Sequence, residues 1–256
     1  MKTGKLYLIP SNLSTAFMPA AILPASVIAT AIRLNHYVAE NAKSARAFLK
    51  AIGVERPLME ISIRELNSQT RTDALIDMIA PLLAGHDVGL VSEAGAPGVA
   101  DPGALIVAIA HQHGIQVVPL VGPSSILLGL MASGLNGQTF AFHGYLPQEK
   151  SARITTIAAL EKESHQRNMT QLFIETPYRN QALYADLLTV LAPSTHLCLA
   201  RDLTGSRECV QTKRVSEWRK EMLLLDKLPT LFLFLAEPAR SRRLEAKRQF
   251  ADAACK

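Results

Sequence analysis

Residues 91–103 have the sequence V-S-E-A-G-A-P-G-V-A-D-P-G and follow an apolar run, 87–91, that is typical of a buried parallel strand. Asp101 and Pro102 predict the start of a helix, with Asp101 as its N-cap and Pro102 at the first helical position. A loop with so few bulky side chains lets a ligand approach the backbone, and open α/β sheets bind ligands at the carboxyl ends of their strands. The stretch therefore predicts a ligand-binding loop, although a glycine-rich turn without a ligand fits the spacing equally well.

On both sides of this loop, strand-like and helix-like segments alternate through the first half of the chain, as a parallel sheet requires. The strands expected there are 5–10, 35–39, 57–61, 87–91 and 115–120. The second half is mixed, with a helix expected at 215–225 and strands at 139–145, 170–175, 197–201, 208–213 and 230–236. We therefore predict an α/β protein whose strands need not all be parallel in the second half.

The chain changes character at Val121, where V-G-P-S-S-I-L-L-G-L-M-A-S-G-L begins. Gly122 and Pro123 interrupt the preceding strand, and Ser124 or Ser125 is suited to cap the apolar helix that follows. We place a domain boundary here. The expected organisation is two α/β domains, 1–120 and 121–238, followed by a basic tail, 239–256.

The composition of the chain is that of an ordinary globular protein. Its 256 residues are 48% hydrophobic, enough for two small cores, and its net charge of +5 permits an anionic partner such as RNA without requiring one. The three cysteines are Cys198, Cys209 and Cys255, a sparse set that favours a reducing compartment. No metal-binding motif, signal-peptide pattern or membrane-length apolar run is present, so we expect a cytoplasmic protein without a metal site.

Five segments, in order along the chain, carry a resemblance to a known family. They are residues 91–103, the stretch that begins at Val121, F-A-F-H-G-Y-L-P from Phe140, F-I-E-T-P-Y-R from Phe173 and A-R-D-L-T from Ala200. These segments resemble the tetrapyrrole-methylase superfamily of S-adenosylmethionine-dependent methyltransferases. Within it, they are similar to the branch that methylates ribose 2′-hydroxyl groups of small-subunit ribosomal RNA.

The resemblance implies two α/β domains with S-adenosylmethionine in the cleft between them, usually in a homodimer. The positions of this chain that match the superfamily's cofactor contacts are Pro10, Ala94, Gly95, Ala96, Val99, Ser124, Ser125, Glu175, Leu203 and Thr230. The first seven follow strands of the first half or lie at the domain boundary, and the last three occupy strand-end positions that line the adenosine pocket.

Two motifs of the rRNA branch are altered in this chain. After the first strand the branch has T-P-I-G-N-L-x-D, where this chain has P-S-N-L-S at 10–14. After the second strand it has C-E-D-T-R, where this chain has A-E-N-A-K at 39–43 and retains Glu40. The cofactor motifs are thus intact while the substrate motifs have diverged, as in a paralogous branch.

Methylation of a ribose hydroxyl requires removal of a proton as the carbon–oxygen bond forms, and Glu40 is our candidate for that base. An acid interacting with a helix N-terminus is an equally good interpretation of Glu40. Three functions remain open: an rRNA methyltransferase, a methyltransferase of a tetrapyrrole or other small anionic acceptor, and a non-catalytic paralog that binds S-adenosylmethionine or RNA.

Overall fold

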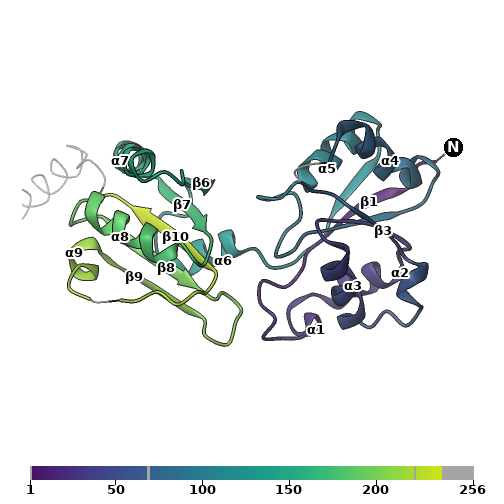
Figure 1. Ribbon diagram of the computed structural model, residues 1–256, viewed down its shortest axis with the longest axis horizontal. Helices are drawn as coiled ribbons and strands as arrows, with labels where there is room; N and C mark the ends of the chain where they lie inside the picture. Colours follow the sequence, from purple (N-terminus) through teal and green to yellow (C-terminus); the bar gives the residue numbers. More distant parts are fainter. Residues whose placement is uncertain (1, 68–69, 222, 238–256) are drawn as a thin grey trace, which may run out of the picture. The chain divides into compact units, whose positions relative to one another are not determined.

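Two sheets, one in each half of the chain, organise the fold that a computed structural model describes for residues 2–67, 70–221 and 223–237 (Figure 1). Unit 1 comprises the described residues within Met1–Ser125 and Thr204–Ser206, and unit 2 those within Ile126–Leu203 and Arg207–Lys256. The predicted α/β class is confirmed. The predicted basic tail, 239–256, lies outside the described residues.

The sheet of unit 1 has the strand order β3-β2-β4-β1-β5, and all neighbouring strands are parallel. Its strands are β1 (Lys5–Ile9), β2 (His36–Ala39), β3 (Ser62–Glu65), β4 (Val88–Val91) and β5 (Gln116–Pro119). Every residue of the central strand β4 is buried, which explains its uninterrupted apolar sequence.

Helices cover both faces of this sheet, as a parallel sheet requires (Figure 1). They are α1 (Pro19–Ile22), α2 (Ala25–Arg33), α3 (Ala42–Ala51), α4 (Thr72–Leu83) and α5 (Gly103–Gln112), with a short 3₁₀ helix, η1 (Leu58–Glu60). One apolar cluster contains Leu82 of α4 and Ile106 of α5, and another contains Ala31 of α2 and Leu49 of α3. The sheet is therefore buried between two layers of helices.

The centre of this sheet is a point where the direction of the chain reverses. The chain passes from β1 to β2 beyond β4, and from β4 to β5 beyond β1, so the connections leave two neighbouring strands in opposite directions. Open α/β sheets bind ligands in the crevice that such a reversal creates at the carboxyl ends of the strands. In this chain, the segments that begin at Pro10 and Ser92 lie at that point.

The sheet of unit 2 has the strand order β6-β7-β10-β8-β9, and only β6 and β7 pair in parallel. Its strands are β6 (Phe140–Tyr145), β7 (Thr170–Glu175), β8 (His196–Arg201), β9 (Cys209–Arg214) and β10 (Thr230–Leu235). The helices are α6 (Ser125–Ser133), α7 (Lys150–Arg167), α8 (Asn180–Val190) and α9 (Val215–Trp218). The second half is thus mixed, as predicted.

The two faces of this sheet are packed differently. Phe232 and Phe234 of β10 share an apolar cluster with Leu183 of α8 and Trp218 of α9. Their neighbour in the strand, Leu231, points to the opposite face. A Cβ atom built on Gly129 of α6 would lie only 2.4 Å from the Leu231 side chain, so α6 packs closely against that face.

Two predicted elements are wrong. The strand expected at 57–61 is replaced by η1, and the strand itself lies at β3, after Ile61. The helix expected at 215–225 ends at Trp218, whose indole N–H donates to the Leu197 carbonyl at 2.8 Å. Ile61 and Trp218 are buried, but a short apolar pattern does not distinguish a strand from a helix. None of the helices in the described ranges has the length and apolar character needed to span a bilayer.

Candidate cofactor-binding site

The loop that follows β1 pairs with the loop that follows β4. The Ser11 N–H donates to the Gly95 carbonyl at 2.9 Å, and the Gly95 N–H donates to the Ser11 carbonyl at 3.2 Å. The Ser11 hydroxyl also donates to the Ser92 carbonyl at 3.0 Å. These bonds fix the backbone of the predicted ligand loop against the end of the neighbouring strand.

Gly95 is required at this position for two reasons. Its φ angle is +74°, which L-residues with a side chain rarely adopt. A Cβ atom there would also lie 3.1 Å from the Leu13 side chain and 3.6 Å from the Pro123 carbonyl oxygen. A side chain at this position would therefore crowd Leu13 and reach the Pro123 carbonyl.

Asp101 holds the other end of the loop. Its carboxylate accepts from the Gly98 N–H at 2.9 and 3.0 Å and from the Gly103 N–H at 2.7 Å. Between these anchors, Gly98 and Ala100 have positive φ angles of 81° and 60°. Burial raises the pKa of Asp101, although the bonds from Gly98 and Gly103 oppose that shift. The predicted helix start is wrong by one residue, because Pro102 is the N-cap and α5 begins at Gly103.

A third segment reaches the same place from β5. The Leu120 N–H donates to the Leu8 carbonyl at 3.0 Å, which extends the pairing beyond the strand. A Cβ atom on Gly122 would lie 2.3 Å from Pro10, so these two residues are in close contact. Ser124 and Ser125 follow directly and are partly exposed. Within unit 1, the structure thus brings together the three segments that carry the predicted cofactor contacts.

The exposed loop residues of this region have small side chains, and Asn12, next to Ser11, has a buried polar atom that no described residue satisfies. Ala94 is exposed, Ala96 is partly exposed, and Val99 is 48% exposed. The amide nitrogen of Asn12 donates to the Phe17 carbonyl at 2.8 Å, whereas its Oδ1 atom is buried without a hydrogen-bond partner among the described residues. A buried acceptor of this kind needs a donor, which the amine or ammonium group of a bound ligand can supply.

Glu40 also reaches the loop. Its Oε1 atom accepts from the Glu93 N–H at 3.1 Å, and the Glu93 carboxylate accepts from the Ser44 hydroxyl at 3.1 Å. Burial raises the pKa of Glu40, as do the nearby charges of Asp101 and Glu93, while the bond from the Glu93 N–H lowers it. Capping of α3 is done instead by Asn41, whose side chain accepts from two backbone N–H groups. The resulting concentration of carboxylates suits a cationic ligand.

In unit 2, the predicted residues Glu175 and Thr230 face each other across neighbouring strands. The buried Glu175 carboxylate accepts from the Arg179 guanidinium at 2.7 and 2.9 Å and from the Thr176 N–H at 2.6 Å. Leu203 lies just beyond β8, whose last residue pairs with Thr230. The three predicted positions therefore lie at the same end of the sheet, where β7 and β8 finish and β10 begins.

Asn180 lies at this end of the sheet and was not predicted from the sequence. Its amide nitrogen donates to the Leu228 carbonyl at 2.8 Å and to the Thr230 hydroxyl at 3.2 Å. Its Oδ1 atom is buried without a partner among the described residues. The single sequence gave no signal for this role, because an asparagine at the start of a helix is ordinarily a capping residue.

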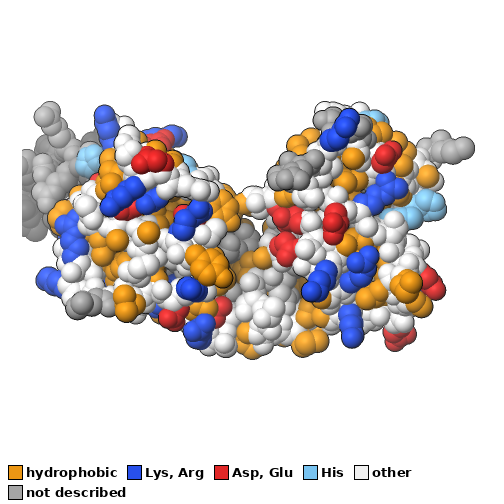
Figure 2. Space-filling model, in the orientation of Figure 1, with side chains coloured by type: hydrophobic (Ala, Val, Ile, Leu, Met, Phe, Trp, Pro, Cys, Tyr) orange, Lys and Arg blue, Asp and Glu red, His pale blue; other side chains and the backbone are white. Residues whose placement is uncertain are grey.

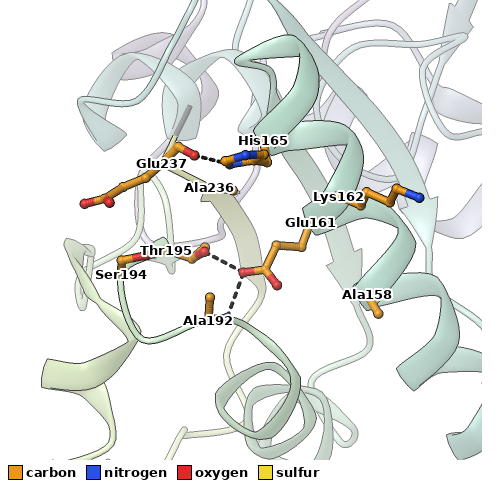
Figure 3. A pocket seen from close by; sticks show the side chains of 9 residues that line it. All are labelled: Ala158, Glu161, Lys162, His165, Ala192, Ser194, Thr195, Ala236 and Glu237. Carbon is orange, nitrogen blue, oxygen red and sulfur yellow. Dashed lines mark hydrogen bonds between the residues drawn. The ribbon is translucent and has the colours of Figure 1, made fainter. Parts of the chain in front are cut away.

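A separate pocket of about 530 Å³ lies between α7 and the end of β10 in unit 2 (Figure 3). None of the predicted site residues lines it. Its central carboxylate, Glu161, accepts from the Ala192 N–H at 2.8 Å and from the Thr195 hydroxyl, so it ties the α8–β8 loop to α7. Across the described ranges, no three His, Cys, Asp or Glu side chains are grouped to hold a metal ion.

Comparison with known proteins identifies sequence relatives, although no family model matches the chain. Ribosomal RNA small subunit methyltransferase I of Vibrio cholerae is 36% identical over 156 residues, which are 61% of this chain and 52% of that protein. The protein of the same name from Escherichia coli O157:H7 is 29% identical over 85% of this chain and 73% of its own length. That of Xylella fastidiosa is 34% identical over 67% of this chain and 60% of its own length. The chain thus spans about half of the first relative.

Solved structures share the fold. The methyltransferase CobJ superimposes with a TM-score of 0.61 at 14% identity, over 91% of this chain and 95% of its own. Uroporphyrin-III-C-methyltransferase from Thermus thermophilus gives a TM-score of 0.51 at 19% identity, over 92% and 93% of the two chains. The chain therefore has the fold of these two methyltransferases. Its relatives by sequence are the proteins named Ribosomal RNA small subunit methyltransferase I.

Proposed function

We propose that this chain is an S-adenosylmethionine-dependent methyltransferase that acts on RNA of the small ribosomal subunit, at a ribose 2′-hydroxyl. The observation that carries the proposal is the sequence relationship to Ribosomal RNA small subunit methyltransferase I, which in one comparison extends over 85% of the chain. The paired loops at Ser11 and Gly95 support it, because they lie where an open α/β sheet binds its ligand.

The residues proposed to hold the cofactor are those that the resemblance assigns. In unit 1 they are Pro10, Ala94, Gly95, Ala96, Val99, Ser124 and Ser125, and in unit 2 they are Glu175, Leu203 and Thr230. The unpartnered Oδ1 atom of Asn12 in unit 1 fits this cofactor, since S-adenosylmethionine carries an adenine amine and an ammonium that can donate to it. The bound cofactor supplies the activated methyl group.

The contribution of the protein to methyl transfer is mainly orientation. Fixed backbone at the loop holds one reactant in place, and the carboxylates of Glu40, Glu93 and Asp101 favour the positive charge of a sulfonium. We assign Glu40 the role of the base that accepts the ribose hydroxyl proton. Its raised pKa brings it closer to the range in which a carboxylate is an effective base.

Transfer of a radiolabelled methyl group tests the substrate. Purified protein and labelled S-adenosylmethionine are added to an extract of a strain from which the gene has been deleted, and RNA, protein and small-molecule fractions are counted separately. We expect label in small-subunit rRNA, in a form that resists alkaline cleavage at the adjacent phosphodiester. Label in the small-molecule fraction would favour a tetrapyrrole or other small acceptor. Absence of label from every fraction would favour a non-catalytic paralog.

We further propose a homodimer located in the cytoplasm. Leu127 and Met131 are 54% and 78% exposed and lie one turn apart on α6, where they form an apolar stripe that a second copy can cover. The location follows from the proposed substrate, because ribosomal subunits are cytoplasmic in bacteria such as those that encode the relatives.

A further inference from the structure

Tyr178 is an exposed aromatic residue near the end of the unit 2 sheet that carries Glu175 and Thr230. Tyr178 lies in the loop between β7 and α8 and is 79% exposed. The ammonium of Lys227 lies 4.9 Å from the centre of its ring. A single exposed tyrosine needs no explanation, but a cation placed on the ring from the distant segment before β10 makes a defined surface.

Arg179, next to this ring, is held in a fixed orientation. Its Nε and Nη2 atoms donate to Glu175, whose side chain is only 1% exposed, while the Arg179 side chain is 34% exposed. Its Nη1 atom has no hydrogen-bond partner in the part of the chain that the structure describes. Glu175 therefore fixes the guanidinium of Arg179, which retains one N–H group that can donate to an anion.

Two further arginines lie in or just after the strand β8, which finishes at this end of the sheet. Arg201 is the last residue of β8 and pairs with Thr230. Arg207 is 61% exposed and reaches Asp226, the neighbour of Lys227, at 3.4 Å. On the face drawn in Figure 2, the lysine and arginine side chains of unit 2 are scattered over its surface. Tyr178 thus combines an exposed ring with the Lys227 ammonium placed on it and the Arg179 guanidinium next to it in the chain.

This combination matches the chemistry of unpaired RNA. Bases in single strands, loops and bulges stack on aromatic side chains, and the phosphates beside them bind lysine and arginine. Bases inside a duplex are stacked on each other and cannot offer a face to the ring. We propose that Tyr178, flanked by Lys227 and Arg179, is a stacking site for an unpaired base of the RNA substrate. This inference rests on the proposed function, which it deepens by naming an RNA contact.

Binding of a fluorescently labelled single-stranded oligoribonucleotide to the full chain tests the stacking site. We expect Tyr178→Ala to raise Kd by about 5- to 150-fold, the loss measured when a stacking aromatic is removed. Tyr178→Trp should restore binding, and binding of a duplex of the same sequence should be insensitive to Tyr178→Ala. A Tyr178→Ala variant that binds the single strand as tightly as the wild type would overturn the proposal.

The salt dependence of the same titration tests the cation. We expect Lys227→Gln to reduce the slope of log K against log salt by about 0.7, the value for one phosphate contact to a single strand. The control is Lys162→Gln, which removes an exposed lysine on α7 beside the pocket at the other end of β10 and should leave the slope unchanged. Equal slopes for Lys227→Gln and the wild type would contradict the assigned phosphate contact.

Titration with S-adenosylmethionine separates the stacking site from the proposed function. Both Tyr178 variants should bind the cofactor like the wild type, and loss of that binding would assign the ring to the cofactor and overturn the proposal. If the wild type binds the cofactor but no RNA, the RNA substrate fails together with the stacking site. If the wild type binds RNA and Tyr178→Ala binds it equally well, only the stacking site fails.

Discussion

The Asp101 carboxylate accepts the Gly98 N–H through both oxygens, at 2.9 and 3.0 Å, and so closes the loop after β4 into a fixed shape. The same carboxylate accepts from Gly103 at the start of α5. The loop and the start of α5 are therefore connected through one side chain. This makes Asp101 a positioning residue for the loop, whereas its sequence context predicts only a helix cap.

Asp101→Ala leaves the N–H groups of Gly98 and Gly103 without an acceptor. We expect the free energy of unfolding to fall by about 1–3 kcal/mol, the cost of unsatisfied buried donors. We also expect at least a tenfold weaker affinity for S-adenosylmethionine, since a factor of ten needs only about 1.4 kcal/mol. Denaturant unfolding and calorimetric titration measure the two effects. Asp101→Asn keeps one acceptor oxygen and should lose less, so equal affinities for all three proteins would show that the loop is not the cofactor site.

The sequence predicted the parts of the fold whose side-chain pattern is set by burial. The strand expected at 170–175 coincides with β7, in which five of six residues are buried. Prediction from the sequence failed where the apolar pattern is short. In β3, an edge strand, no residue is buried, so no apolar run marks it. Ile61, just before β3, is buried, and the strand was predicted to end at this residue instead of after it.

The candidate site was predictable only as separate segments. The letters around Gly95 indicate a loop that requires glycine, yet they do not show that its partner is Ser11 or that Glu40 accepts from the backbone of Glu93. Those contacts join segments that lie far apart in the chain, and the side-chain periodicity of each segment is independent of them. For the same reason, the contact between Tyr178 and Lys227 has no counterpart in any local motif.

Glu40→Gln tests the proposed base. We expect the rate of methyl transfer to fall by about 10²- to 10⁴-fold while the affinities for S-adenosylmethionine and RNA remain unchanged. The glutamine side chain keeps an oxygen that can accept from the Glu93 N–H, so the loop should be preserved. Unaltered methyl transfer by this variant would leave Glu40 with a structural role only.

The stability of the wild type relative to this variant should depend on pH. Because the pKa of Glu40 is raised in the folded state, the wild type binds its proton more readily when folded and loses stability as the pH rises from its ordinary value of 4.5 through the raised one. Glu40→Gln cannot lose stability in this way. The melting temperature of the variant, relative to the wild type, should therefore be higher at about pH 7.5 than at about pH 4. A difference that is the same at both pH values would contradict the raised pKa of this carboxylate.

Arg153 and Asp186 form a buried ion pair that ties α7 to α8. Both side chains are 9% exposed, and the two bonds from the guanidinium to Asp186 Oδ2 measure 2.8 and 2.5 Å. We expect Asp186→Ala to lower the free energy of unfolding by about 3–5 kcal/mol, because it leaves Arg153 charged and buried. Adding Arg153→Met should recover part of that loss. Losses that simply add in the double variant would show that the two groups do not interact.

The apolar stripe on α6 tests the oligomeric state. If it is the homodimer contact, light scattering should give twice the monomer mass for the wild type and the monomer mass for Leu127→Glu combined with Met131→Glu. Met59→Glu is the matched control, because Met59 is 98% exposed in unit 1 and should tolerate a charge without dissociation. A wild type that is monomeric at all concentrations rules out the homodimer.

The most direct test of the cofactor site is a calorimetric titration with S-adenosylmethionine of the wild type, Gly95→Arg and Gly114→Arg. Both glycines have positive φ angles, 74° and 64°, so each variant places an L side chain in the left-handed region, but only Gly95 has the Leu13 and Pro123 loops within reach of a side chain. We predict a Kd in the micromolar range or below for the wild type and Gly114→Arg, and no binding for Gly95→Arg. Equal binding by all three proteins, or none by the wild type, would contradict the assignment of the loop after β4 as the cofactor site.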